Sequence, residues 1–144
     1  MTRAPAFELD GRSLHAMLQQ GPVLLAFFKI SCPICQLTLP YLSRMKHGAL
    51  QIVAISQDDP ESTAEFNEAF QVSLDTLYDS EDAGYPVSNA YGITNVPAMF
   101  LVEPDGTISK EINGFVKQEM EQLGARSGIA PFQPGDYAPA WKAG

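Results

Sequence analysis

The chain has 144 residues, which is the length of one ordinary domain and too short for two. Its composition, 45% hydrophobic and 18% charged, is typical of a soluble globular protein and excludes a disordered, collagen-like or disulfide-framework chain. No apolar run approaches the roughly 20 residues of a membrane-spanning helix, and the first residues lack the apolar core of a signal peptide. We therefore expect a single domain without a membrane-spanning helix. The sequence as given predicts a cytoplasmic protein, and an exported form is the alternative if a signal peptide has been removed.

The formal net charge of -8 is unevenly distributed. Between His47 and Ser109 the sequence has eleven acidic residues and no Lys or Arg. A nucleic-acid-binding surface needs clustered Lys and Arg to neutralise phosphates, so this class of function is excluded. The acidic stretch either steers cationic or neutral partners toward the protein or is a solvated surface that keeps it soluble, and the sequence leaves both interpretations open.

Helix-like and strand-like patterns alternate along the chain. Leu14, Met17 and Leu18 have helical spacing, and the apolar run at 23–30 is typical of a buried central strand. In chain order, the expected elements are a helix at 13–20, a strand at 23–30, a helix at 33–45, a strand at 50–56, a helix that begins at Pro60, a strand at 74–78, a helix within 82–91, two strands at 98–103 and 107–112 joined by the turn Pro104-Asp105-Gly106, and a helix at 117–126. Gly84 and Pro86 interrupt the start of the helix within 82–91, so it is expected in the C-terminal half of that stretch. This alternation predicts the α/β class, with a mixed or parallel sheet covered by helices.

The end of the sequence differs from the rest. Residues 129–144 contain three prolines and no periodicity. We expect a domain at 1–128 followed by an extended tail at 129–144 that contributes little to the core. Phe132, Tyr137 and Trp141 are candidate anchors for this tail.

The two cysteines form the motif Cys32-Pro33-Ile34-Cys35 between the expected strand and the helix at 33–45. The first turn of a helix has unpaired N–H groups and the positive end of the helix dipole, which stabilise a thiolate over a thiol. Cys32 is therefore the candidate nucleophile. Cys35, one turn further, is the candidate resolving thiol that attacks a mixed disulfide at Cys32.

The cysteine pair has two other interpretations. A metal site would need two further ligands, and the only histidines, His15 and His47, do not have a recognised zinc spacing. Two buried, inert cysteines would suit apolar helix positions but would explain neither the strand-to-helix location nor the proline between them. Redox chemistry without a metal or other cofactor is thus the favoured prediction.

The segment FFKISCPICQLTLP at 27–40 resembles the active-site segment of thioredoxin-like thiol-disulfide oxidoreductases, especially the TlpA and ResA group. Pro40 occupies the place of the family's helix-kinking proline, and Val96-Pro97 is similar to its cis-proline loop. The turn at 104–106 also matches, so the resemblance covers about residues 5–125. The 62 positions from Cys35 to Pro97 exceed the thioredoxin minimum by roughly twenty, which resembles the insertion of TlpA-like proteins and peroxiredoxins in the AhpC/TSA-related redoxins.

This resemblance implies a fold and a site. The fold is thioredoxin-like, a central mixed sheet with helices on both faces and an extra helix-strand insertion between the CxxC helix and the cis-proline loop. The implied catalytic residues are Cys32, Cys35 and Pro97, and the implied substrate-binding residues are Pro33, Ile34, Val96 and Pro97. The implied partners are protein or small-molecule disulfides or dithiols and an unidentified electron donor, with the protein itself a monomer.

The sequence departs from the family at three positions near the cysteines. Ser31 replaces the usual aromatic residue before Cys32. The nearby Lys29 either favours the thiolate, if its side chain turns toward it, or extends from the strand end into solvent. Ala26 and Thr38 stand where related proteins have an acid. Proton transfer at the resolving thiol would then need water or another acid.

Two other functions remain as alternatives. A peroxiredoxin-like thiol peroxidase would need a proline and a threonine before its cysteine, and Leu25 and Lys29 stand at those positions. A non-catalytic thioredoxin-like binding module would use the acidic surface, and its cysteines would not cycle. The sequence favours the thiol-disulfide oxidoreductase over both.

Overall fold

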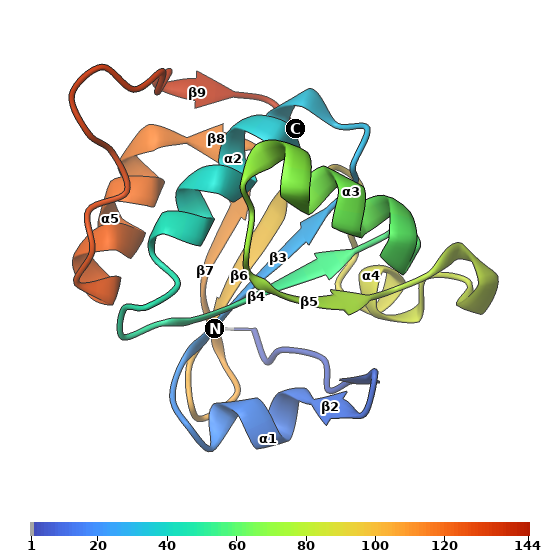
Figure 1. Ribbon diagram of the computed structural model, residues 1–144. Helices are drawn as coiled ribbons and strands as arrows, with labels where there is room; N and C mark the ends of the chain where they lie inside the picture. Colours follow the sequence, from blue (N-terminus) through green and yellow to red (C-terminus); the bar gives the residue numbers. More distant parts are fainter. Residues whose placement is uncertain (1) are drawn as a thin grey trace.

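The fold is built around one five-stranded sheet, seen in a computed structural model that describes residues 2–144 (Figure 1). The elements in chain order are β1 (Glu8–Leu9), β2 (Arg12–Ser13), α1 (Leu14–Leu18), β3 (Val23–Phe28), α2 (Pro33–Arg44), β4 (Gln51–Ser56), α3 (Pro60–Phe70), β5 (Asp75–Tyr78), the 3-10 turn η1 (Glu81–Ala83), α4 (Pro86–Ala90), β6 (Ala98–Val102), β7 (Ile108–Asn113), β8 (Phe115–Val116), α5 (Lys117–Ser127) and β9 (Trp141–Lys142). No helix within this described part of the chain is long and apolar enough to cross a membrane.

The sheet has the strand order β5-β4-β3-β6-β7. Strands β3, β4 and β5 are parallel, whereas β6 is antiparallel to both β3 and β7. This mixed sheet with helices on both faces is thioredoxin-like, as the resemblance predicts. Helix α3 and strand β5 supply the expected insertion between the cysteine helix and the loop before β6.

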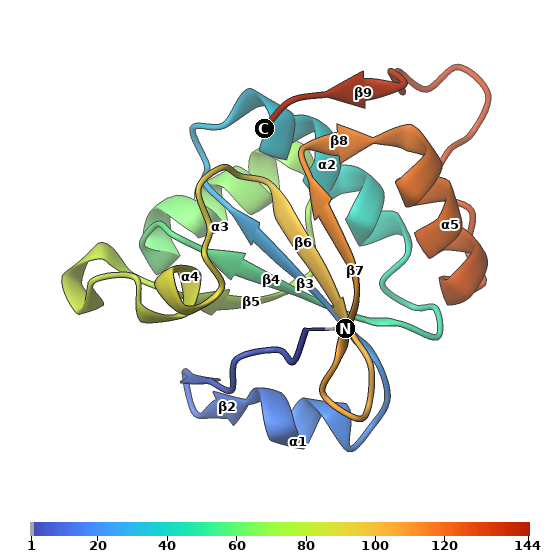
Figure 2. The same cartoon turned by 180° about the vertical axis from the view of Figure 1, so that it is seen from behind.

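Alternation along β3 divides the core into two layers. Leu24, Ala26 and Phe28 face the cluster that contains buried residues of α2, α3 and α5. The intervening residues of β3 face a second cluster with α1 and α4. Figures 1 and 2, which view the sheet from opposite sides, show these two groups of helices on its two faces. All six side chains of β3 are fully buried, which agrees with the continuous apolar run in the sequence.

The helix expected within 82–91 is found in the C-terminal half of that stretch, as α4, which begins at Pro86. A short 3-10 turn precedes it. Gly84 and Tyr85 between them adopt left-handed backbone conformations, with φ of +80° and +53°. A right-handed helix cannot continue through two such residues, so the pattern breaks into two pieces.

The outer strands of the sheet are short or irregular. β5 has four residues, and the carboxylate of Asp10 accepts the backbone N–H of Tyr78 at 2.9 Å. β7 has Lys110 and Glu111 in its middle, and its register with β6 shifts between Leu101 and Val102. Neither edge presents a long, regular row of backbone groups.

The C-terminal residues return to the domain. The half-buried ring of Phe132 packs edge-on against Tyr41 of α2, with ring centroids 4.8 Å apart, and also against Phe115. The guanidinium of Arg44 donates to the carboxylate of Asp136, and the hydroxyl of Tyr41 donates to the carbonyl of Tyr137. Of the three aromatic candidates, Phe132 is thus packed against the core, whereas the rings of Tyr137 and Trp141 are exposed.

This packing makes residues 129–144 contribute to stability. Phe132→Ala removes the packed ring and is expected to lower the free energy of unfolding by about 1–2 kcal/mol, as for a partly buried aromatic residue. Tyr137→Ala is the matched control, because it removes an exposed ring and keeps the backbone carbonyl that Tyr41 contacts. Urea unfolding of both variants checks the prediction, and equal stability of the two would contradict it.

Candidate functional site

The first cysteine lies at the junction between β3 and α2. Cys32 has an extended backbone and is the N-cap of α2, and Pro33 occupies the first turn, where its missing N–H costs nothing. The backbone N–H of Cys35 donates to the sulfur of Cys32 at 3.2 Å. The motif therefore forms the helix start that the sequence predicts, with the sulfur of Cys32 as the capping atom.

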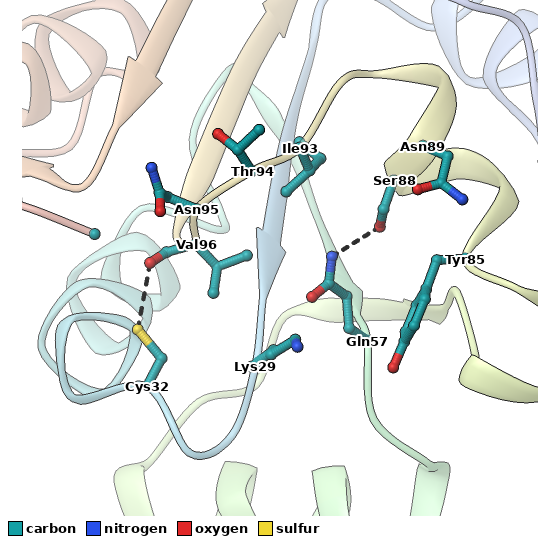
Figure 3. A pocket seen from close by; sticks show the side chains of 11 residues that line it. Lys29, Cys32, Gln57, Tyr85, Ser88, Asn89, Ile93, Thr94, Asn95 and Val96 are labelled. Carbon is teal, nitrogen blue, oxygen red and sulfur yellow. Dashed lines mark hydrogen bonds between the residues drawn. The ribbon is translucent and has the colours of Figure 1, made fainter.

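The second half of the site comes from the loop before β6. The Val96–Pro97 peptide bond is cis, as the resemblance predicts. The thiol of Cys32 donates to the carbonyl of Val96 at 3.4 Å, a contact that spans 64 positions of the sequence (Figure 3). The sulfur of Cys32 thus lies between an N–H group of α2 and the carbonyl that precedes Pro97.

The two thiols differ in exposure. Both cysteines are free, Cys32 is half-exposed, and Cys35 is fully buried in the core layer of α2. Burial, a hydrogen bond to Cys32 and the negative charges of Cys32 and Asp58 raise the pKa of the Cys35 thiol far above its usual range, although a backbone hydrogen bond from Lys29 acts in the opposite direction. Cys35 is therefore protonated at neutral pH.

Asp58 is an acid near the cysteines that the sequence analysis missed. Its carboxylate accepts the backbone N–H of Ile30 at 2.9 Å, which places it against the loop that leads to Cys32. Asp58 follows β4, and Ile30 follows the adjacent parallel strand β3. Because the carboxyl ends of parallel strands meet at one edge of a sheet, this spacing in the sequence was the signal that could have identified it.

The side chains of Ala26, Thr38 and Lys29, near the cysteines, provide no acid or base for the two thiols. Ala26 is fully buried in the middle of β3. The hydroxyl of Thr38, also buried, donates to the carbonyl of Ile34 at 2.7 Å, so it is satisfied within α2. The ammonium of Lys29 lies 5.9 Å from the centre of the Tyr85 ring. Lys29 is exposed at the end of β3 rather than packed in the core.

A pocket of about 420 Å³ opens beside Cys32 (Figure 3). Its wall is mainly polar and includes Gln57, Ser88 and Asn95, and the amide of Gln57 donates to the hydroxyl of Ser88 at 2.9 Å. Lys29 is the one lining residue with a charged side chain. Among residues 2–144, no group of three or more His, Cys, Asp or Glu side chains could hold a metal ion. Cys32 is the cysteine that lines the pocket, and Cys35 lies buried behind it.

The buried thiol gives a testable pH dependence. In Cys32→Ser protein, the rate at which iodoacetamide alkylates Cys35 should rise about tenfold per pH unit from pH 7 to 10, because the thiolate fraction keeps increasing while the pH stays below a raised pKa. In urea, the same thiol should reach a plateau above pH ~9, as an ordinary cysteine does. A plateau at the same pH in folded and unfolded protein would show that burial does not raise this pKa.

The geometry agrees with what comparisons with known proteins show. The AhpC/TSA family model matches residues 2–111. The chain is 30% identical to the thiol-disulfide oxidoreductase ResA of Geobacillus thermodenitrificans over 135 residues, covering 83% of this chain and 75% of that protein. It is 28% identical to ResA of Halalkalibacterium halodurans, covering 78% of this chain and 66% of that protein.

A solved structure supports the fold. The thioredoxin domain of a thiol-disulfide oxidoreductase from Bacteroides vulgatus superposes with a TM-score of 0.72 at 21% identity, covering 87% of this chain and 94% of that domain. At this identity the likeness shows the fold. Together with the family match over most of the chain, it identifies the chain as a member of the AhpC/TSA family, a ResA-like, thioredoxin-like thiol-disulfide oxidoreductase.

Proposed function

We propose that the protein passes two electrons between its Cys32–Cys35 dithiol and a disulfide substrate, with Cys32 as the nucleophile and Cys35 as the resolving thiol. The observation that carries this proposal is the position of the half-exposed sulfur of Cys32, which lies one helical turn from a buried thiol and 3.4 Å from the carbonyl before Pro97. An incoming disulfide can reach the sulfur of Cys32 but not that of Cys35. The inner thiol is held where it can attack afterwards.

In the first step, the thiolate of Cys32 attacks one sulfur of the substrate disulfide. A new S–S bond forms between Cys32 and the substrate, the substrate's own S–S bond breaks, and its second sulfur leaves as a thiolate that takes a proton from solvent. The N–H of Cys35 donates to the attacking sulfur and orients it. Backbone groups at Val96, beside Pro97, are the nearest polar partners for an extended substrate.

In the second step, Cys35 loses its proton and attacks the sulfur of Cys32. The Cys32–Cys35 disulfide forms, the mixed disulfide breaks, and the remaining substrate sulfur leaves as a thiol. The raised pKa of Cys35 makes its deprotonation the demanding part of this step. Water is the proton acceptor, because the carboxylate of Asp58 is bonded to the N–H of Ile30. A dithiol reductant returns the protein to its starting state, and the same exchange in reverse oxidises a substrate dithiol.

The neighbours of Cys32 complete the proposed binding surface. Pro33 is exposed and Ile34 half-exposed on the first turn of α2, and Val96 is half-exposed on the facing loop. Pro97 is buried and fixes the direction of that loop. These four residues would contact the substrate on either side of the reactive sulfur.

The roles of the two cysteines are separable by substitution. Cys35→Ser should accumulate a mixed disulfide between Cys32 and substrate, because the first step remains and the second is lost. Cys32→Ser should neither trap substrate nor turn over, since its remaining thiol is buried. Non-reducing gels and mass spectrometry after mixing with a disulfide-containing protein check this asymmetry, and equal trapping by both variants would contradict the assignment.

A peroxidase is the second candidate, because the AhpC/TSA family model matches most of the chain. A peroxidatic site needs positioned donors that stabilise the negative charge of the departing oxygen. Leu25 is fully buried in the middle of β3 and has no donor, and the ammonium of Lys29 lies over Tyr85. The described site therefore favours disulfide exchange over peroxide reduction.

The two activities can be compared directly. The reduced protein should react with hydrogen peroxide at about the rate of an ordinary exposed thiolate and should exchange with a disulfide much faster. Stopped-flow measurements of both reactions at one pH, with Cys32→Ser as the blank, check this expectation. Peroxide oxidation orders of magnitude above that of a free thiolate would overturn the disulfide-exchange proposal.

A further inference from the structure

The pocket beside Cys32 has one wall that comes from the end of the sequence. Gly144 lines it together with Cys32 and Val96. In Figures 1 and 2 the chain runs from α5 past α2 and ends near the start of α2, where Cys32 lies. We call residues 140–144 the strap.

The segment before the strap is held by side chains, whereas the strap is held by its backbone. Phe132 packs against Tyr41, and Arg44 binds the carboxylate of Asp136. Beyond these anchors, the carbonyl of Ala140 accepts the N–H of Lys117 at 3.0 Å, and β9 pairs with β8. Every residue from 140 to 144 is exposed. Because it buries little apolar surface, the strap can detach while the anchored segment stays in place.

The strap lies directly on the loop that precedes Pro97. A Cβ atom placed on Gly144 would be 2.7 Å from the carbonyl oxygen of Val96, which is closer than real Cβ contacts come. On the other side, a Cβ atom on Gly114 would overlap the carbonyl oxygen of Lys142. The N–H of Gly114 itself donates to the carbonyl of Pro97 at 2.9 Å. The strap is thus packed between the backbone of Val96 and that of Gly114, which lies in the turn between β7 and β8.

An extended polypeptide and the strap need the same space. The carbonyl of Val96 accepts a hydrogen bond from the thiol of Cys32 and is in contact with Gly144. A polypeptide lying along Val96 would have to displace the strap. A small disulfide needs only the sulfur of Cys32, which the polar pocket of about 420 Å³ makes accessible without moving the strap.

We propose that residues 140–144 determine substrate specificity: when docked, the strap excludes extended polypeptides from Val96 and admits small polar disulfides to Cys32 through the pocket. Detachment of the strap opens the site to polypeptide disulfides. This inference rests on the proposed function and adds the substrate class that each state of the strap accepts.

Alkylation tests the strap without any redox turnover. In the reduced protein, the rate of modification at Cys32 is measured by mass spectrometry with N-ethylmaleimide and with the same maleimide attached to an extended peptide. Deletion of residues 140–144 should raise the rate with the peptide reagent about tenfold, because a few backbone hydrogen bonds can maintain a ratio of docked to detached strap of about ten. It should change the rate with N-ethylmaleimide less than about twofold. An unchanged ratio of the two rates would overturn the proposal.

A glycine substitution provides a second variant that keeps the strap. Gly114→Ala should displace it, because the new methyl group would overlap the carbonyl of Lys142. Gly11→Ala is the matched control: its φ of +76° is close to the +78° of Gly114, and no atom lies within 4 Å of the added methyl group. Gly114→Ala should raise the peptide-maleimide rate as the deletion does, and Gly11→Ala should not. Equal effects of both would assign the change to backbone strain and overturn the role of the strap.

Turnover separates this inference from the proposed function. The deletion should accelerate reduction of a polypeptide disulfide about tenfold and leave reduction of a small disulfide such as oxidised glutathione within about twofold. Equal acceleration of both substrates would overturn the strap as a specificity element. If no variant reduces either disulfide, the proposed function fails, whereas the alkylation ratio still decides whether the strap excludes polypeptides.

Discussion

The redox site depends on the pairing of β3 with two neighbours of opposite direction. β3 is parallel to β4 and antiparallel to β6, and Phe27 is paired with Ala98. The end of β3, which leads to Cys32, therefore lies beside the start of β6, which follows Pro97. Because β3 is buried on both faces, a shift of one residue would exchange its two sets of side chains between different core layers. The contact between Cys32 and the loop before Pro97 is thus fixed by the packing of the core.

The elements nearest the cysteines could be predicted from local sequence. A continuous apolar run is typical of a strand buried on both faces, and β3 is such a strand. Pro33 at a helix start predicts where α2 begins, since the ring fits the first turn. The position of Pro97 opposite Cys32 and its cis bond came from the resemblance to a family. Neither follows from local preferences, because most X-Pro bonds are trans.

The remaining parts of the site could not be predicted because they depend on contacts between distant segments. Residues 129–144 have no periodicity, and β9 exists only through hydrogen bonds to β8. The glycine at 114 is an ordinary turn residue in the sequence, but in the structure it leaves room for Lys142 and Gly144. Asp58 approaches the cysteines only because β3 and β4 end side by side. Such contacts are set by the tertiary fold rather than by residue patterns.

The edges of the sheet have a consequence for the way the protein meets other polypeptide chains. A long, flat edge strand offers free backbone groups to which another chain can add as a further strand. Here β5 is short and capped by the carboxylate of Asp10, and β7 has Lys110 and Glu111 and an irregular register. Charge, brevity and irregularity all discourage strand addition. The two edges of this sheet are therefore poor templates for strand addition by another chain, so contact with a substrate is confined to the end of the sheet where Cys32 lies.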